Sequence, residues 1–255
     1  MKVAVAGAGG RMGRTLVEAV LADRALTLAA AFDVPGSAAI GQAAGPVTIT
    51  ADAKAAAQAA DVVIDFTRPE GTLAHLEHAR AMVIGTTGFS PADRSAIERA
   101  AQRIPIAMAA NFAVGVNAVY RLAETAARIL GDAYDVEIVE AHHRHKVDAP
   151  SGTALALGEV VAKVLKRDLK TDAVWGRHGD TGERAPRAIG FHAIRGGDIV
   201  GEHTVIFAGS GERVEVTVRS QSRMTYAAGA LRAAKFLRGR AAGLYGMADV
   251  LGLGV

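Results

Sequence analysis

The chain has 255 residues, half of them hydrophobic, and its 29 Lys and Arg nearly balance its 26 Asp and Glu. This length suits one large domain or two modest ones, and the lack of a long basic run argues against nucleic acid or a membrane surface as partner. Without cysteine there are no disulfides, thiolate metal ligands or thiol nucleophiles. With no signal-peptide pattern and no apolar stretch of membrane-spanning length, we expect a cytoplasmic protein.

Short apolar runs alternate with helix-like segments over residues 1–113. The apolar runs are 3–6, 26–32, 47–49, 62–66, 82–85 and 104–109, and helices are expected over 11–22, 53–60, 69–80 and from Ser90 onward. Buried parallel strands are continuous apolar runs rather than alternating ones. The pattern therefore predicts a Rossmann-type doubly wound parallel sheet, an α/β dinucleotide-binding domain.

The pattern changes over residues 114–222. Helices are predicted over 115–130 and 151–166, and strands over 134–141, 188–194, 199–208 and 213–219. The glycine-rich segments 196–198 and 209–211 look like hairpin turns. This predicts an α+β domain with a mixed or antiparallel sheet. Residues 223–255 follow with an amphipathic helix over 224–237, which periodicity alone does not place on either domain.

A glycine loop connects the first strand to the first helix: Gly7-Ala8-Gly9-Gly10-Arg11-Met12-Gly13. Backbone amides at such a helix start hold a pyrophosphate, and the spacing fits G-x-x-G-x-x-G through Gly7, Gly10 and Gly13. Asp33 follows the second strand, 20 residues beyond Gly13, where an acid binds an adenosine ribose. Its charge repels a 2′-phosphate and Val34 offers no cation, which favours NADH over NADPH unless Arg11 or Arg14 compensates. An ordinary tight turn with a surface Asp is the alternative.

Two further loops end predicted strands. They are Gly85-Thr86-Thr87-Gly88-Phe89 and Ala109-Ala110-Asn111-Phe112. Ligands of open α/β sheets bind along the carboxyl ends of the strands. We therefore expect Gly85, Thr86, Thr87 and residues 109–112 to contact the nicotinamide end of the cofactor, although plain strand-to-helix loops explain their positions equally well.

Three of the 8 histidines lie within four positions, in Glu140-Ala141-His142-His143-Arg144-His145-Lys146. Three interpretations stay open. A general-acid site uses His and Lys, because imidazole donates protons near neutral pH. A zinc site through Glu140 and the histidines has poor spacing and adjacent cations. The third is a solvated charged loop.

Pro150-Ser151-Gly152-Thr153 opens the next predicted helix. Hydroxyls and backbone amides at a helix start form a socket for an anion, and Gly152 permits close approach of a ligand. Lys146 and His143 add positive charge. The segment predicts a carboxylate-binding site, and it also fits a helix N-cap, which does not exclude the socket.

These segments together resemble the dihydrodipicolinate reductase family, also called 4-hydroxy-tetrahydrodipicolinate reductases. The resemblance spans nearly the whole chain and rests on the segments 7–13, 65–71, 85–89, 109–117, 140–153, 197–203 and 222–225. The histidine segment is the most specific of these.

The resemblance implies an NAD(P)H-dependent enzyme of lysine and diaminopimelate biosynthesis, which transfers hydride to C4 of a cyclic dicarboxylate. It implies His142 as proton donor with Lys146 beside it, and His143, Lys146, Ser151, Gly152 and Thr153 as substrate-binding residues. It assigns Gly7 to Met12, Asp33, Gly85 to Thr87 and Ala109 to Phe112 to the cofactor, and no metal. It further implies a homotetramer joined through residues 114–222, and a C-terminal helix that returns to the dinucleotide-binding domain.

Three other functions are weighed against this one. An amino-acid dehydrogenase with a similar two-domain plan would not need the socket at residues 150–153. A non-catalytic NAD-binding regulator gives no reason for His142 and Lys146. A metal-dependent hydrolase would lose activity to a chelator.

Overall fold

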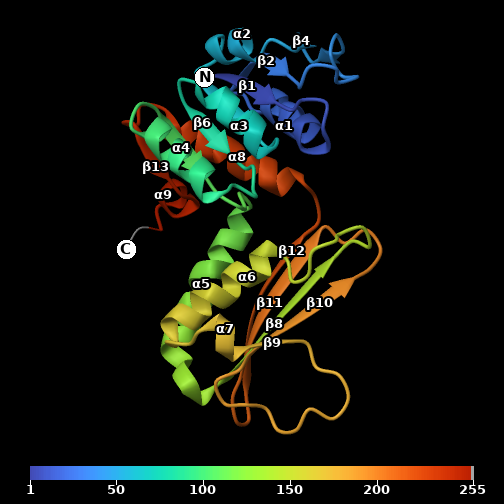
Figure 1. Cartoon of the computed structure of the whole chain (residues 1–255), viewed down its shortest axis with the longest axis vertical. Helices are drawn as coiled ribbons and strands as arrows, with labels where there is room; N and C mark the ends of the chain where they lie inside the picture. Colours follow the sequence, from blue (N-terminus) through green and yellow to red (C-terminus); the bar gives the residue numbers. More distant parts are fainter. Residues whose placement is uncertain (254–255) are drawn as a thin grey trace. The chain divides into compact units, whose positions relative to one another are not determined.

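The computed structural model describes residues 1–253 of the chain. The chain divides into two compact units (Figure 1). Unit 1 consists of Met1–Val114 and the segment from Arg223 onward, and unit 2 is Gly115–Ser222. None of the helices within residues 1–253 has the length and hydrophobicity needed to span a membrane.

Unit 1 is built on an eight-stranded sheet in the order β13-β7-β6-β5-β1-β2-β4-β3. Every strand pair is parallel except β3 with β4. This confirms the predicted Rossmann-type sheet. The strands are β1 (Lys2–Ala6), β2 (Thr27–Phe32), β3 (Ala43–Ala44), β4 (Val47–Thr50), β5 (Val62–Asp65), β6 (Met82–Ile84), β7 (Pro105–Met108) and β13 (Gly243–Tyr245).

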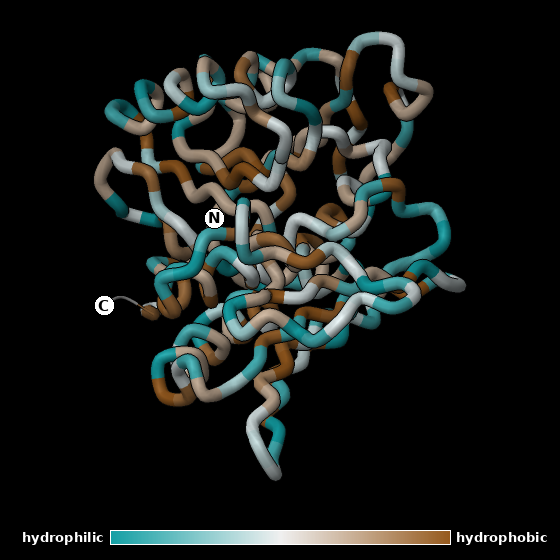
Figure 2. Tube along the Cα trace, turned by 60° about the horizontal axis from the view of Figure 1, so that its bottom comes forward, coloured by the Kyte–Doolittle hydropathy of each residue, from teal (hydrophilic) through white to brown (hydrophobic). Residues whose placement is uncertain are grey.

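Helices cover both faces of this sheet. Val3 and Val5 of β1 belong to one hydrophobic cluster, and Ala4 and Ala6 to another. Both faces are therefore buried, which explains why the central strands contain continuous hydrophobic runs, such as 3–6 and 62–64. Hydrophobic stretches of the chain alternate with hydrophilic ones along the trace (Figure 2). The helices are α1 (Arg11–Ala22), α2 (Ala53–Gln58), α3 (Pro69–Leu76), α4 (Pro91–Ala101), α8 (Met224–Leu237) and α9 (Met247–Leu251).

Helix α8 joins the first of these clusters, although it follows unit 2 in the sequence. Ala227, Ala230 and Ala234 are fully buried with Val3 and Val5. A Cβ at Gly229 would clash with the carbonyl oxygen of Phe112, so glycine permits the close packing of α8 on the chain after β7.

Unit 2 contains a five-stranded mixed sheet in the order β12-β11-β8-β10-β9. Helices α5 and α6 pack on one face, where Val119 and Leu157 meet Ile138 and Val205. The elements are α5 (Val114–Leu130), the 3₁₀ turn Gly131–Ala133, β8 (Asp135–His142), α6 (Gly152–Val164), α7 (Leu169–Asp172), β9 (Ala173–Trp175), β10 (Ile189–Arg195), β11 (Gly201–Ala208) and β12 (Arg213–Ser220).

One of the two predicted hairpins is wrong. The turn 209–211 connects the antiparallel strands β11 and β12, as expected. Gly196-Gly197-Asp198, however, connects β10 to β11, and β8 lies between these two strands. β10 pairs parallel to β8, and β11 pairs antiparallel to its other edge. The glycine segment therefore crosses the end of β8, where the Gly196 N–H donates to the carbonyl of His142 (3.0 Å).

Candidate active site

The glycine loop lies at the carboxyl end of β1, and α1 begins directly after it. Gly7 has a φ of +63°, a left-handed conformation that favours glycine. A Cβ at Gly13 would clash with the carbonyl oxygen of Gly7, so the third glycine of the motif permits close packing of α1 on the loop. Gly10 caps α1 without a side chain, and its own N–H donates to the Gly7 carbonyl (3.0 Å). This geometry suits a phosphate group at the helix start.

Asp33 braces this loop. One carboxylate oxygen accepts the Gly9 N–H and the other accepts the Val34 N–H, each at 2.8 Å. A Cβ at Gly9 would lie 2.7 Å from the first oxygen. Each oxygen keeps a second lone pair for a ligand hydroxyl. The sequence predicted a ribose ligand at this position and did not predict the contact with the loop.

A cavity of about 810 Å³ brings together Gly7, Gly10 and Asp33. Its wall also carries basic side chains that the sequence analysis did not single out: Lys54, Arg68, His75 and His78. A space of this size with a glycine loop, an acid and several donors fits a dinucleotide.

His75 is fixed by a buried carboxylate. Its Nδ1 lies 2.6 Å from Asp65, which is fully buried at the end of β5. Thr67 and Thr86 also donate their hydroxyl groups to Asp65, at 2.6 and 3.2 Å. The hydroxyl of Thr86 is thus engaged inside the protein, so any cofactor contact by Thr86 would involve its backbone.

A second cavity, of about 460 Å³, is lined by Thr86, Thr87, Ala109 and Ala110 together with Tyr245 of β13. It lies at the carboxyl ends of β6 and β7, in agreement with the edge rule for parallel sheets. Other predicted cofactor residues turn inward: the side chains of Ala8 and Phe112 are buried. Gly85 is required for packing, because a Cβ there would clash with the Phe66 ring.

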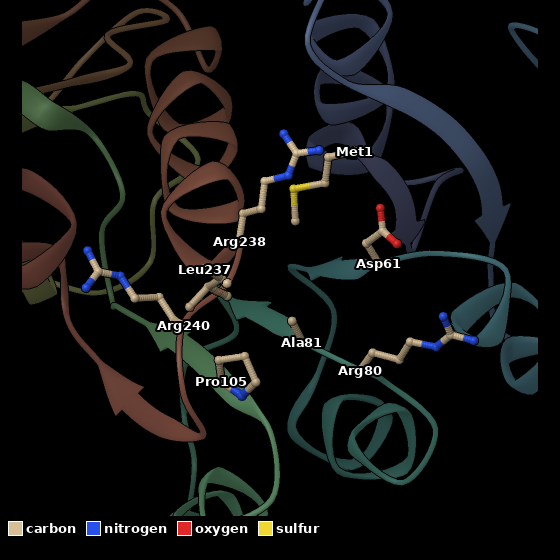
Figure 3. Close-up of a pocket in the computed structure, with 9 residues that line it drawn as sticks. Met1, Asp61, Arg80, Ala81, Pro105, Leu237, Arg238 and Arg240 are labelled. Carbon is tan, nitrogen blue, oxygen red and sulfur yellow. The ribbon is translucent and has the colours of Figure 1, made fainter.

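The opposite edge of the sheet holds a cavity of about 450 Å³ with three arginines, Arg80, Arg238 and Arg240 (Figure 3). Met1, Asp61, Ala81 and Pro105 also line it, and these precede or begin β1, β5, β6 and β7. The three guanidinium groups point away from one another (Figure 3). They do not converge on one anion.

In unit 2, the histidine segment is organised around the buried carboxylate of Glu140, which is 1% exposed. The Nδ1 atom of His142 lies 2.6 Å from Glu140 Oε2. Arg195 donates through Nη1 to Oε2 (2.8 Å) and through Nη2 to Oε1 (2.7 Å), and the Ser151 N–H donates to Oε1 (3.1 Å). Glu140 therefore organises the site from within and is not placed as a metal ligand.

These contacts shift the ionisation of the cluster. Burial opposes the ionisation of Glu140, but hydrogen bonds from Arg195 and His142 outweigh it and lower its pKa. Burial lowers the pKa of His142, and nearby Lys146 and Arg195 add to this against the opposing effect of Glu140. His142 is thus neutral near pH 7, and its Nδ1 atom faces the Glu140 carboxylate.

His203 lies beside His142, with the two rings edge to face and their centroids 5.1 Å apart. Burial, followed by repulsion from His142 when it is protonated and from Lys146 and Arg195, outweighs the effect of Glu140 and lowers the pKa of His203 to about 4. Its Nε2 lies 3.0 Å from the Ser151 hydroxyl. A second neutral imidazole therefore lies in contact with both His142 and the helix start at Ser151.

The chain leaves the sheet immediately after His142, where β8 ends. A turn follows, in which the Lys146 N–H donates to the His143 carbonyl (3.1 Å). Strand alternation therefore does not set the directions of His143 and His145, whose ring centroids are 6.2 Å apart. Lys146 pairs with Asp148 at 2.8 Å, a partner not predicted from the sequence.

The predicted anion socket begins α6. The Ser151 hydroxyl accepts the Ala154 N–H (3.2 Å) and so forms the N-cap, the alternative weighed for this segment. Thr153 forms a hydrogen bond with the hydroxyl of Tyr120, a partly buried residue. Gly152 differs from both, because a Cβ there would meet no protein atom within 4 Å. The open space at this helix start is at Gly152.

Arg195 and His203 were not among the predicted site residues. They come from β10 and β11, which flank β8, and the register places Arg195 opposite His142 and His203 opposite Glu140. Within residues 1–253, no group of three or more His, Cys, Asp or Glu side chains is placed to hold a metal ion.

Comparisons with known proteins place the whole chain in one family. The model described as "Dihydrodipicolinate reductase, N-terminus" matches residues 1–112, and "Dihydrodipicolinate reductase, C-terminus" matches residues 115–251. A 4-hydroxy-tetrahydrodipicolinate reductase of Aromatoleum aromaticum is 63% identical, covering 99% of this chain and 96% of that protein. One from Cupriavidus pinatubonensis is 58% identical, covering 99% of this chain and 100% of that protein.

The fold has a similar counterpart among solved structures. A dipicolinate-bound dihydrodipicolinate reductase from Paenisporosarcina sp. TG-14 superposes with a TM-score of 0.77 at 24% identity, covering 98% of each chain. The fold agrees with the family models, which cover both units. The chain belongs to the dihydrodipicolinate reductase family of oxidoreductases.

Proposed function

We propose that the chain reduces 4-hydroxy-tetrahydrodipicolinate, by way of dihydrodipicolinate, to tetrahydrodipicolinate with NAD(P)H, in lysine and diaminopimelate biosynthesis. The names of relatives that are 63% and 58% identical support this substrate. The observation that carries the proposal is the neutral imidazole of His142, which is bound to the buried Glu140 and lies among cations.

Unit 1 would hold the cofactor. The amides of the loop Gly7 to Met12 would bind the pyrophosphate, and Asp33 the adenosine ribose. The loops Gly85 to Thr87 and Ala109 to Phe112 would line the nicotinamide end, mainly through their backbone. When bound, the reduced nicotinamide supplies a hydride to ring C4 of the substrate.

Unit 2 would supply the proton and hold the dianion. Hydride addition leaves an enamine, which must take up a proton to give the product. His142 is the proposed proton donor, with Lys146 beside it, since an imidazolium both stabilises developing negative charge and donates a proton. His143, Lys146, Ser151, Gly152 and Thr153 would bind the carboxylates. Because the Ser151 hydroxyl already caps α6, we assign the closest approach to the Gly152 backbone.

The proton must reach His142 before it can be donated. The substrate carries two carboxylates, and negative charge near an imidazole raises its pKa. Substrate binding would thus oppose the effects of burial, Lys146 and Arg195 that keep His142 neutral in the free protein. His142 would therefore take up its proton when the dicarboxylate substrate binds.

We propose NADH as the preferred cofactor, with NADPH also accepted. Asp33 would repel a 2′-phosphate, and Val34 beside it offers no positive charge. Lys54 and Arg68 line the same cavity as Asp33, so a 2′-phosphate would still meet cations there.

We further propose a cytoplasmic homotetramer, joined through the sheet of unit 2. Helices α5 and α6 pack on one face of this sheet. Thr204 and Ile206 of β11 point to the other face, since they alternate with the buried residues Val205 and Phe207. A tetramer would cover that second face.

The test is NADH oxidation on the condensation product of pyruvate and aspartate semialdehyde. Turnover that persists in EDTA supports the proposal and separates it from a metal-dependent hydrolase. Binding of NADH without oxidation would favour a regulator, and turnover of linear amino acids in its place would favour an amino-acid dehydrogenase.

A further inference from the structure

Four nitrogen atoms lie within hydrogen-bonding distance of the Glu140 carboxylate, and three of them can only donate. At Oε1 they are Arg195 Nη2 and the Ser151 N–H, and at Oε2 they are Arg195 Nη1 and His142 Nδ1. Guanidinium and amide groups only donate, whereas an imidazole nitrogen either donates or accepts. His142 is therefore the only one of the four partners whose protonation can adjust to Glu140.

Three neighbouring strands, β8, β10 and β11, contribute the side chains of this arrangement. Glu140 and His142 lie on the same face of β8 because they are two residues apart. Arg195 ends β10, in register with His142, and also donates to the Asp148 carbonyl (2.6 Å). His203 of β11 packs against the His142 ring from the other side. The imidazole is thus held by its hydrogen bond to Glu140 and by its packing against His203, and these contacts set its ring orientation.

We propose that Glu140, clamped by Arg195, is the positioning residue for His142. It accepts the Nδ1 proton and so leaves Nε2 as the nitrogen that exchanges a proton with the substrate. This inference rests on the proposed role of His142 as proton donor. Arg195 has a second role, since its charge compensates that of Glu140 and keeps the carboxylate ionised in a buried position.

The charges around His142 follow from the same contacts. Glu140 on β8 is balanced by Arg195 on β10, and Lys146 in the following turn is paired with Asp148. His203 on β11 faces the ring as a neutral group. With these charges paired, the Nδ1 tautomer is set by the hydrogen bond to Glu140. A carboxylate that orients a catalytic imidazole in this way determines which nitrogen is available for reaction.

The decisive variant is Glu140→Gln, which keeps the size and removes one acceptor. The amide oxygen is required at the Oε1 position, where both partners are obligatory donors. The amide NH₂ then occupies the Oε2 position, where it loses the hydrogen bond from Arg195 Nη1 and can donate only to His142 Nδ1, which must accept. The variant therefore forces the proton of neutral His142 from Nδ1 to Nε2, the nitrogen that should face the substrate.

Glu137→Gln is the matched control. Glu137 lies on the same strand, and its carboxylate is held by two arginines and a histidine, Arg177, Arg184 and His192. Burial opposes its ionisation, but hydrogen bonds from Arg177, His192 and Arg184 lower its pKa to about 2. Both variants therefore weaken arginine pairs of a β8 carboxylate, and only Glu140 contacts His142.

The test combines ¹⁵N NMR of the histidine side chains with kinetics. The His142 signals are assigned by their loss in His142→Gln. We expect the Nδ1–H tautomer in the wild type and in Glu137→Gln, and the Nε2–H tautomer in Glu140→Gln. We expect Glu140→Gln to lower kcat about 10²-fold, the usual scale for general acid catalysis, and to change KM little. The pH profile of kcat should also shift in Glu140→Gln, whereas it should stay unchanged in Glu137→Gln.

Three results would overturn the inference: an Nε2–H tautomer in the wild type, an unchanged tautomer in Glu140→Gln, or equal losses of kcat in the two glutamine variants. Binding of dipicolinate, measured by calorimetry, checks that Glu140→Gln still folds. If the variant does not fold, the wild-type tautomer alone decides. Since the tautomer is read without turnover, a failure of the proposed reaction leaves this test intact.

Discussion

Arg195 and Glu140 are 55 residues apart in the sequence, yet their guanidinium and carboxylate groups meet through two hydrogen bonds of 2.8 and 2.7 Å. The carboxylate is 1% exposed, so it depends on Arg195 for compensation of its charge. Removing one partner of a buried ion pair leaves the other charge uncompensated and is strongly destabilising.

Arg195→Leu should therefore destabilise unit 2 by about 3–5 kcal/mol, the usual cost of breaking a buried pair. Trp175, the only tryptophan of the chain, stacks on Phe191 in unit 2 and reports its unfolding by fluorescence. Arg213→Leu is the control, because its pair with Glu215 is exposed and such pairs contribute about 0–1 kcal/mol. Equal unfolding midpoints in urea would contradict the prediction.

Acid should destabilise unit 2 before the rest of the protein. The pKa of His203 is lowered from 6.5 to about 4 in the folded state, and that of His142 is lowered too. Between pH 6.5 and 4 the unfolded chain therefore binds more protons than the folded one, and stability falls as the pH falls. For His203 the loss amounts to roughly 3 kcal/mol across this window.

Trp175 fluorescence in urea at pH 7 and pH 5 measures this effect. His203→Gln, which keeps a hydrogen-bond partner for Ser151, should reduce the pH dependence. A wild-type midpoint that does not change between the two pH values would be incompatible with a neutral, buried His203.

Gly152→Ala should separate ligand binding from folding. A Cβ at Gly152 meets no protein atom within 4 Å, so the free energy of unfolding should change by no more than about 0.5 kcal/mol. If the carboxylate approaches this backbone, the new methyl group should weaken dipicolinate binding about tenfold, since close approach requires glycine. Gly196→Ala, which also meets no atom within 4 Å, is the control. Unchanged affinity in Gly152→Ala would remove Gly152 from the proposed socket.

Asp33→Ala should weaken the binding of NADH more than the binding of NADPH. The substitution removes the proposed ribose acceptor, and it also removes the repulsion of a 2′-phosphate. A lost hydrogen bond to a charged group corresponds to about a tenfold change or more in the NADH dissociation constant. Asp61→Ala is the control, because Asp61 also accepts a backbone N–H, from Lys2 at 2.8 Å, but at the other edge of the sheet. An unchanged ratio of the two affinities in Asp33→Ala would exclude the ribose contact.

The fold was largely predictable because the strands of unit 1 are buried on both faces. Such strands leave continuous apolar runs, and the capping box of Ser90 and Asp93 marks the start of α4 as clearly. The exceptions have physical reasons. β13 has three residues and carries no periodic signal. The hairpin predicted at 196–198 failed because hydrophobic patterns do not report which strands are neighbours.

The site was predictable where it is continuous in the sequence. The histidine segment and the start of α6 both lie within residues 140–153, so their clustered histidines, cations and hydroxyl groups can be recognised directly in the sequence. Arg195 and His203 reach Glu140 and His142 only because β8 occupies the middle of the sheet. Strand order and register determine these contacts. The hydrogen bond between Asp33 and Gly9 was not predictable for the same reason, because it depends on how the loop after β1 approaches the end of β2.

The most direct test of the account is the turnover of 4-hydroxy-tetrahydrodipicolinate by His142→Gln, with NADH binding measured in parallel. NADH affinity should stay at the wild-type level, because the proposed cofactor residues lie in unit 1. We predict that kcat falls by about 10²-fold or more, the usual contribution of a general acid. Turnover near the wild-type rate would contradict the account, since the reaction would then take its proton from another group.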